Sequence, residues 1–284
     1  MLTRIQHFAI VSENFVREAR FYESAFGMVR SKPGSEEEQK AIRSNYAVSI
    51  SDGYVGVTMI GRKPGYVPGL HHFGVDVDNV DEAIARIKKN YPEVAVLKRP
   101  SNRPFATYGA HDPEGNYFDL TQAGMSNRRD VYAAQAGAIH SGEQGQPTRR
   151  VHHLKLRVMN APAIAAFYRD MLDLGEADKA LEDPNFYLTD GRMTLTIAPW
   201  RMSDFEGAGI ERPGLEHVGF QIESVDKVKK ELAALREADP EMRERTIAEP
   251  SEGERRVALI ASCRHGQHQL SSPDGVFVDI CEGR

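Results

Sequence analysis

The sequence predicts an α+β protein made of four similar segments that pair into two domains. Three observations support this prediction. The pattern of segment one recurs in segment three, and that of segment two recurs in segment four. A small, polar, glycine-rich stretch separates the two pairs. Each segment opens with a histidine, at His7, His72, His153 and His217. We therefore expect an N-terminal domain over 1–122, a linker over 123–150 and a C-terminal domain over 151–284.

Segments one and three have the same order of elements. Residues 4–11 are typical of a strand, and a helical repeat of apolar residues then runs from Asn14 to Gly27. Tyr22 follows His7 by 15 residues, as Tyr168 follows His153. Further strands are expected around turns at Asp52-Gly53 and Asp190-Gly191, so each segment reads as strand, helix, strands.

Segments two and four are predicted to begin with strands over 71–77 and 216–222. Helices over 80–87 and 225–235 are expected to follow. Each segment ends in a strand that contains an aspartate, Asp119 or Asp279, seven residues after a turn. Residues 31–45 and 200–213 are expected to be loops.

Composition limits the classes of function. The net charge of −5 comes without a basic cluster, which argues against nucleic acid as a partner. No apolar run approaches the roughly 18 residues that span a bilayer, and no secretory signal opens the chain. Cys263 and Cys281 are too few for a disulfide framework. We expect a cytoplasmic homo-oligomer that binds a small molecule.

Two histidines and one aspartate recur at matching points in each half, and this pattern predicts metal binding. Such a set leaves three adjacent positions of an octahedral ion open, which suits non-haem Fe(II); Mn(II) or another divalent ion is the alternative. A lone strand histidine is usually structural, but a duplication does not require four polar residues on buried strands. Buried aspartates without a partner would also be costly. The possibility that only one half holds the metal stays open. The candidate ligands are His7, His72, Asp119, His153, His217 and Asp279.

These residues resemble the vicinal oxygen chelate superfamily, which contains glyoxalases, bleomycin-resistance proteins and extradiol dioxygenases. The resemblance rests on the opening histidine strands, on Phe21-Tyr22 with Gly27, and on the closing strand around Asp119. It implies four βαβββ modules, paired into two cupped mixed sheets. It also implies ligands from the first strand of each module and the last strand of the second. Some relatives pair module one with module four, which would give His7, His217 and Asp279.

The four-module layout resembles two-domain extradiol dioxygenases, in which the C-terminal pair of modules holds Fe(II). Two departures are visible. Aspartate replaces the family's usual glutamate, and Thr58 or Thr196 stands where glyoxalases have a fourth ligand. His268, 11 residues before Asp279, is the candidate acid–base residue, and Tyr108 holds the matching place before Asp119. Strand alternation should turn His71 and His152 away from the ligands, and we interpret them, with His111 and His140, as structural or solvated.

The resemblance predicts an Fe(II)-dependent extradiol-type dioxygenase that uses dioxygen to cleave a catechol-like substrate. A metal-dependent isomerase, epimerase or lyase of the glyoxalase type is the alternative, in which the ion stabilises an enediolate. A third hypothesis is a metal-free resistance protein that binds a small molecule in the same cup.

Overall fold

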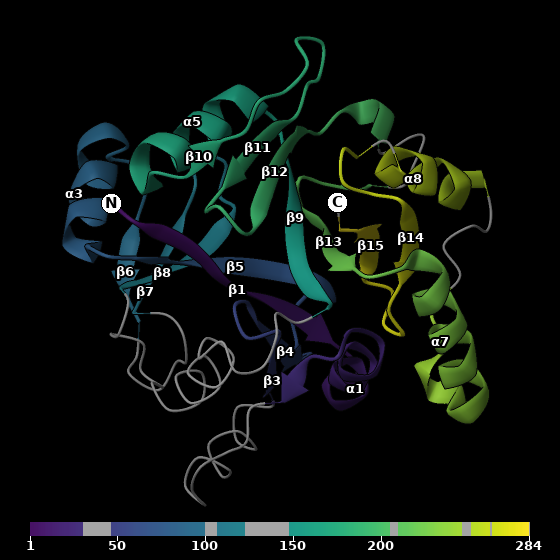
Figure 1. The fold of residues 1–284 in the computed structure, drawn as a ribbon. Coiled ribbons are helices and arrows are strands. Elements are labelled where there is room, and N and C mark those ends of the chain that lie inside the picture. The colour runs from purple at the N-terminus through teal and green to yellow at the C-terminus, as the bar shows by residue number, and fades with distance from the viewer. Residues whose placement is uncertain are drawn as a thin grey trace, which may run out of the picture.

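Two mixed β-sheets form the framework of the protein, as a computed structural model shows (Figure 1). The structure describes residues 1–30, 47–99, 107–122, 148–204, 210–245, 251–261 and 263–283. The eight-stranded sheet has the order β2-β3-β4-β1-β5-β8-β7-β6, and the seven-stranded sheet has the order β10-β11-β12-β9-β13-β15-β14. The predicted α+β fold with two paired-module domains is therefore confirmed.

The first sheet contains the strands of segments one and two. Its members are β1 (Thr3–Ser12), β2 (Val29–Arg30), β3 (Ala47–Ser51), β4 (Gly56–Gly61), β5 (Gly69–Val77), β6 (Val96–Lys98), β7 (Tyr108–His111) and β8 (Tyr117–Gln122). The second sheet contains those of segments three and four. Its members are β9 (Arg150–Val158), β10 (Gly175–Glu176), β11 (Phe186–Thr189), β12 (Thr194–Pro199), β13 (Gly214–Ile222), β14 (His268–Ser271) and β15 (Phe277–Glu282).

The two central strands of each sheet join its two modules. Strand β1 runs antiparallel to β5, and β9 runs antiparallel to β13. The closing strands β8 and β15 lie parallel to β5 and β13. Module one therefore pairs with module two, and the alternative pairing with module four does not occur.

Each module carries one helix after its first strand. These helices are α1 (Phe15–Phe26), α3 (Val80–Asn90), α5 (Ala161–Leu172) and α7 (Val225–Ala238). An asparagine or serine side chain caps each helix by accepting a hydrogen bond from the third backbone N–H beyond it. The capping residues are Asn14, Asn79, Asn160 and Ser224.

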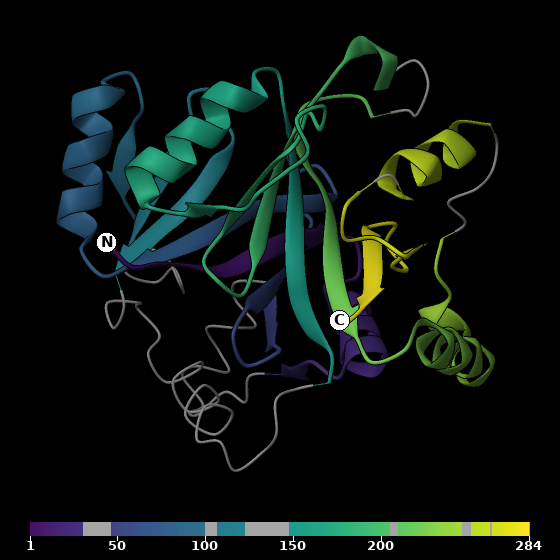
Figure 2. The ribbon, with the colours of Figure 1, turned by 45° about the horizontal axis from the view of Figure 1, so that its top comes forward.

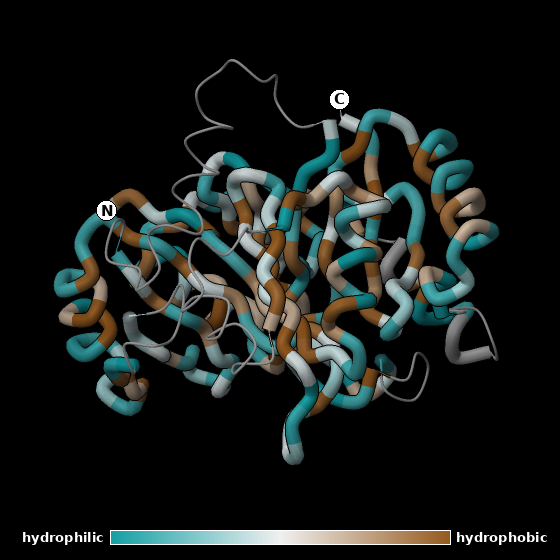
Figure 3. Tube along the Cα trace, turned by 90° about the horizontal axis from the view of Figure 1, so that it is seen from below, coloured by the Kyte–Doolittle hydropathy of each residue, from teal (hydrophilic) through white to brown (hydrophobic). Residues whose placement is uncertain are grey.

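The central strands of the two sheets cross at a large angle (Figure 2). Aromatic side chains pack between the two halves. Phe26 of α1 stacks on Phe220 of β13, with ring centroids 3.9 Å apart. Tyr168 of α5 reciprocally packs against Phe73 and Phe118 of the first sheet, at 5.6 and 5.7 Å. Hydrophobic residues concentrate on these central strands, whereas hydrophilic and hydrophobic stretches alternate along the outer helices (Figure 3). We call this aromatic side of each sheet the helix face.

Two aspartates in tight turns link each half to the other in the same way. Asp52 caps its own turn through Oδ1 and accepts the backbone N–H of Val151 at 2.8 Å through Oδ2. Asp190 does the same in the other half and accepts the N–H of Ile5 at 2.8 Å. Each of these N–H groups lies two residues before a repeat histidine. The interface between the halves therefore fixes the strands that carry the candidate ligands.

Several elements differ from the expectation. Helix α8 (Ser251–Ala261), the 3₁₀ helix η1 (Pro240–Met242) and the short strands β6, β7 and β14 were not predicted. The predicted loop at 31–45 lies outside the described residues, as do 123–147 of the predicted linker and 205–209 of the second loop. The domain boundaries therefore stay predictions. Within the described ranges, no helix is long and apolar enough to cross a bilayer.

Candidate metal centres

A β-bulge precedes each of the four repeat histidines. The register between β1 and β5 shifts between Ile5 and His7 on β1, and shifts again between Leu70 and His72 on β5. The second sheet shifts at the matching points before His153 and His217. The extra residue of each bulge falls outside the ladder, so the alternation of side chains breaks there. The four extra residues are Gln6, His71, His152 and Glu216.

The bulge residue contacts Nδ1 of the histidine that follows it in all four modules. Gln6 Oε1 lies 3.3 Å from Nδ1 of His7, and His71 Nδ1 lies 2.7 Å from Nδ1 of His72. In the second half, His152 Nδ1 lies 3.1 Å from Nδ1 of His153, and Glu216 Oε2 lies 3.0 Å from Nδ1 of His217. Histidine ligands usually have their second nitrogen held in this way, which fixes the ring and its tautomer. The prediction that His71 and His152 turn away from the ligands is therefore wrong, because the bulges break the two-residue period.

The N-terminal triad brings His7, His72 and Asp119 together on the sheet face opposite the helix face, which we call the site face. Nε2 of His7 lies 3.4 Å and Nε2 of His72 lies 3.3 Å from Asp119 Oδ2. All three residues are buried, and the two rings meet edge to face. Gly74 lies between His7 and Asp119 in the cross-strand row. A Cβ at Gly74 would come within 2.1 Å of the His7 ring, so glycine is required there.

Two side chains hold the second oxygen of Asp119. Arg99 Nη1 donates to Oδ1 at 2.6 Å, and the Tyr117 hydroxyl donates to the same oxygen. Burial would raise the pKa of Asp119, but its contacts with His7 and His72 hold that pKa far below the usual range. Burial lowers the pKa of His7. A neutral imidazole and an ionised carboxylate are the forms that bind a metal.

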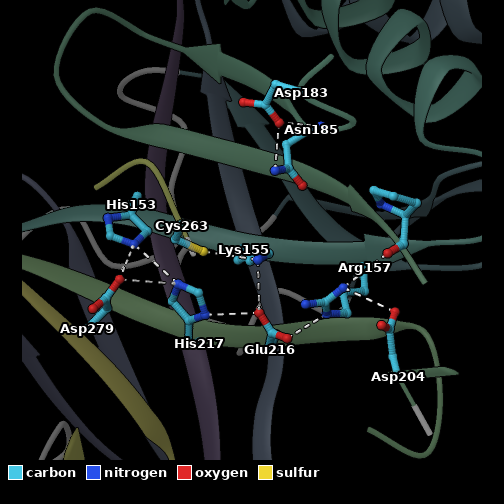
Figure 4. Close-up of polar contacts among 11 residues, drawn as sticks. His153, Lys155, Arg157, Asp183, Asn185, Asp204, Glu216, His217, Cys263 and Asp279 are labelled. Carbon is cyan, nitrogen blue, oxygen red and sulfur yellow. Dashed lines mark hydrogen bonds and ion pairs between the residues drawn. The ribbon is translucent and has the colours of Figure 1, made fainter. Parts of the chain in front are cut away.

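The C-terminal triad repeats this arrangement with His153, His217 and Asp279 (Figure 4). The two Nε2 atoms are 3.3 Å apart and lie 3.6 and 3.9 Å from Asp279 Oδ2. Gln269 donates to Asp279 Oδ1 at 2.9 Å, whereas buried Oδ2 has no hydrogen-bond partner among the described residues. A Cβ at Gly219 would come within 1.9 Å of the His153 ring.

A row of charged side chains continues from the C-terminal triad along the site face (Figure 4). Glu216 contacts His217, lies 3.5 Å from Lys155 Nζ and accepts from Arg157 Nε. Lys155 Nζ also donates to Cys263 Sγ at 3.0 Å. Burial would lower the pKa of His217, but hydrogen bonds to Cys263 and Glu216 outweigh it and raise that pKa to about 9.

The segment 263–266 lies against the C-terminal triad. The ring of His265 packs 5.4 Å from that of His153 and 5.6 Å from that of Tyr187. A Cβ at Gly266 would meet Asp279 Oδ2 at 2.2 Å, so the backbone passes close to this carboxylate. The segment thus shields one side of the triad from solvent.

Both triads fit a divalent metal ion by the chemistry and the spacing of their donors. Each offers two imidazole nitrogens and one carboxylate oxygen, all within 4.8 Å of one another. The bare Oδ2 of buried Asp279 is the kind of atom that a cation would satisfy. The mixed set His7, His217 and Asp279 does not form, because β1 and β13 belong to different sheets.

His268 and Tyr108 are not brought to either triad. His268 pairs with Ile280, and Tyr108 pairs with Leu120, so both side chains lie on the helix face. Gln269 and Gly109 are the residues that pair with the two aspartates. A residue 11 positions before the aspartate therefore lies on the opposite face of the sheet, whereas the residue 10 positions before it shares the aspartate's face.

Several residues of the sites escaped the sequence analysis. Gly74 and Gly219 had a readable signal, since each follows a repeat histidine by two residues and thus shares its face. Lys155 had a similar signal, two residues after His153. Tyr117 had one as well, two residues before Asp119 on the same strand. Arg99 and Cys263 had none, because their approach depends on segments outside these strands.

Comparison with known proteins gives the family. The model of the Glyoxalase/Bleomycin resistance protein/Dioxygenase superfamily matches residues 4–120 and 150–276. A search of curated proteins found no match. The fold is similar to that of an Mn(II)-bound glyoxalase from Novosphingobium aromaticivorans, with a TM-score of 0.61 and 16% identity over 99% of this chain and 83% of the other.

Two solved dioxygenases have the same fold. A 2,3-dioxygenase from Pseudomonas sp. KL28 has a TM-score of 0.61 at 14% identity, over 99% of this chain and 92% of the other. A 2,2',3-trihydroxybiphenyl 1,2-dioxygenase from Sphingomonas wittichii has a TM-score of 0.59 at 14% identity, over 100% and 91%. With a family model that covers both halves and a fold shared with these enzymes, the chain belongs to the vicinal oxygen chelate superfamily of glyoxalases, bleomycin-resistance proteins and dioxygenases.

Proposed function

We propose that the protein is a non-haem Fe(II)-dependent dioxygenase of the extradiol type, which acts on a catechol-like substrate with two adjacent oxygens. The observation that carries this proposal is the buried two-histidine, one-carboxylate set in the C-terminal half, with one carboxylate oxygen lacking a partner among the described residues. This donor set is the one that leaves adjacent positions open for a chelating substrate and dioxygen. The similarity of the fold to two dioxygenases is consistent with it.

The metal would be held by His153, His217 and Asp279, and by His7, His72 and Asp119 if both halves bind an ion. Fe(II), when bound, would supply Lewis-acid and redox chemistry to the substrate and dioxygen. The surrounding residues prepare the ligands for it. Glu216 can accept a hydrogen bond from Nδ1–H of His217, and with the proton on Nδ1 a neutral His217 presents the lone pair of Nε2 to the site. Gln269 fixes the orientation of Asp279.

We propose that the C-terminal triad is the catalytic one. Among the described residues, a row of charged groups that can bind or orient a polar substrate continues from this site and not from the N-terminal one. The segment 263–266 covers one side of it and excludes water there. His268 was the candidate base for a substrate hydroxyl, but its place on the helix face gives that role no geometric support.

A metal-dependent isomerase, epimerase or lyase is the second candidate. The fold similarity to an Mn(II)-bound glyoxalase agrees with this candidate, and Mn(II) is then the alternative metal. A metal-free binding protein is the third candidate.

Two measurements separate these candidates. Anaerobic reconstitution with Fe(II) followed by elemental analysis should give at least one ion per chain. Dioxygen uptake with a panel of catechols should then occur in the wild type. His217→Ala should abolish this uptake, whereas His72→Ala should leave most of it.

Each other outcome selects another candidate. The absence of metal uptake would leave only the binding protein. Metal without dioxygen uptake would favour the isomerase class. The reverse ranking of His217→Ala and His72→Ala would place the active site in the N-terminal half, where Tyr117 contacts the carboxylate.

A further inference from the structure

The charged row on the site face of β9 is a feature that the duplication does not explain. Lys155 and Arg157 lie two and four residues after His153 and share its face. The matching positions after His7 are Ala9 and Val11. The triads are alike, so a metal site of this kind does not need the two cations. Both cations contact the buried carboxylate of Glu216, whose place in the N-terminal half is taken by His71, and this carboxylate does not use all of their donors.

The ammonium group of Lys155 is buried with too few acceptors. The residue is 3% exposed, and the register places it beside His217. Among the described residues its hydrogen bond is to Cys263 Sγ, a weak acceptor, and the carboxylate of Glu216 is 3.5 Å away. An ammonium group has three donors, and leaving them unmet in a buried place is costly.

Arg157 also keeps a free donor. Its Nε donates to Glu216, and its Nη1 donates to the carbonyl of Pro199 at 3.0 Å and to Asp204 at 3.3 Å. Its Nη2 is buried and has no partner among the described residues. In Figure 4 this nitrogen is on the side of the guanidinium that faces Lys155. Lys155 and Arg157 are about 7 Å apart along the strand, the spacing of two residues.

We propose that the C-terminal site takes an acidic substrate, in which a carboxylate accompanies the two adjacent oxygens, and that Lys155 and Arg157 donate to this carboxylate. The inference rests on the proposed function, since it places the chelating oxygens at His153, His217 and Asp279. A carboxylate has two oxygens and about four lone-pair sites, and it forms short hydrogen bonds to both kinds of cation. It therefore satisfies the donors that the protein leaves unmet beside the triad.

Matched acids and amides test the proposal without turnover. The probes are 2,3- and 3,4-dihydroxybenzoate, each paired with the corresponding dihydroxybenzamide, which has the same size and chelating oxygens. Binding to the Mn(II)-loaded protein is measured by calorimetry at pH 7.5 without dioxygen. We expect the acid of at least one pair to bind about tenfold or more tightly than its amide, as a charge-assisted hydrogen bond to a carboxylate would give.

Two lysine variants assign the preference to the site. Lys155→Met keeps the length of the side chain and should reduce the preference to less than about threefold, with the metal content unchanged. Lys227→Met removes a lysine that is 58% exposed in its side chain on α7 and should leave the preference intact.

Three results would overturn the inference. Equal binding of acid and amide in both wild-type pairs would refute it while leaving the proposed function in place. A preference that persists in Lys155→Met would also refute it. A protein that takes up no metal, or that binds neither probe, would remove the inference and the proposed function together.

Discussion

At the scale of single residues, the donors of each triad depend on a small neighbour. Gly74 and Gly219 occupy the row between the first histidine and the aspartate, where a methyl group would overlap an imidazole ring. The two sites therefore require glycine for space, since neither residue has a positive φ. Each candidate metal-binding motif therefore includes a glycine as well as two histidines and an aspartate.

Gly219→Ala should displace His153 and lower metal affinity at the C-terminal site by about tenfold or more, the scale for disturbing a residue that supports a ligand. Metal titration of the purified protein measures this. Gly175→Ala is the control, because a Cβ there meets nothing closer than 3.4 Å. Unchanged metal affinity in Gly219→Ala would mean that His153 is not a ligand.

Asp279→Asn keeps the volume of the side chain but removes the charge that offsets a dication, so metal affinity should fall by about tenfold or more. Asp279→Glu adds a methylene group in a tightly packed place, where Gly266 already lies against the carboxylate. This variant should keep part of its metal and lose more turnover than affinity, because a shift of about 1 Å can cost about 100-fold in rate. Wild-type behaviour of both variants in titration and turnover would exclude Asp279 as a ligand.

At the scale of elements, four bulges decide what the strands present to the metal. A regular strand would turn Gln6, His71, His152 and Glu216 to the helix face, but each bulge directs them to the Nδ1 atom of a ligand histidine. The register of the closing strands matters in the same way. It places Gln269 beside Asp279 and turns His268 toward α7, where Lys229 lowers the pKa of His268 in addition to burial.

Gln269→Ala and His268→Ala should therefore differ in their effect on metal affinity. Loss of the Gln269 amide frees Asp279 to rotate, so metal affinity should fall several-fold. His268→Ala removes a half-buried ring on the other face and should leave metal affinity within about twofold of the wild type. Metal titrations of the two variants decide between them, and a larger effect of His268→Ala would restore its predicted role.

The sequence was sufficient for the first strand and the following helix of each module, for the closing strands and for the residues brought together in both triads, because duplication repeats a strong pattern. It was insufficient where the regular period fails. The bulges turned His71 and His152 to the ligands, and a displacement of one residue separated His268 from Gln269. Helix α8 was missed, since its residues 251–261 begin with a polar stretch that contains a glycine. Cys263 and Lys155 meet across 108 residues, which no local pattern reveals.

At the scale of the whole molecule, α1 also carries a buried carboxylate at the interface of the halves. Glu18 Oε2 accepts the backbone N–H of Asp274 at 3.2 Å, and burial raises the pKa of Glu18 to about 7. Hydrogen bonds to Ser272 and Asp274 lower it only in part. Because the pKa in the folded state exceeds the value of 4.5 expected for the unfolded chain, the fold binds an extra proton between these values.

Stability should therefore fall as the pH rises from about 4.5 through about 7. Glu18→Gln removes this dependence, so the variant should gain about 2 to 3 kcal/mol over the wild type at pH 8 and little at pH 5. Denaturant unfolding at the two pH values measures the difference. Glu241→Gln, at a side chain 68% exposed, is the control. An equal effect of Glu18→Gln at both pH values would show that the charge of Glu18 does not limit stability.

The turn aspartates make the same contact twice in opposite directions, from Asp52 to the second half and from Asp190 to the first. Such reciprocity is the signature of a two-fold symmetric homodimer. The chain is thus arranged like a symmetric dimer whose two protomers are joined in one polypeptide. Fusion frees the two copies to diverge, because a substitution no longer appears in both. Lys155 and Arg157 in one copy stand where the other copy has Ala9 and Val11.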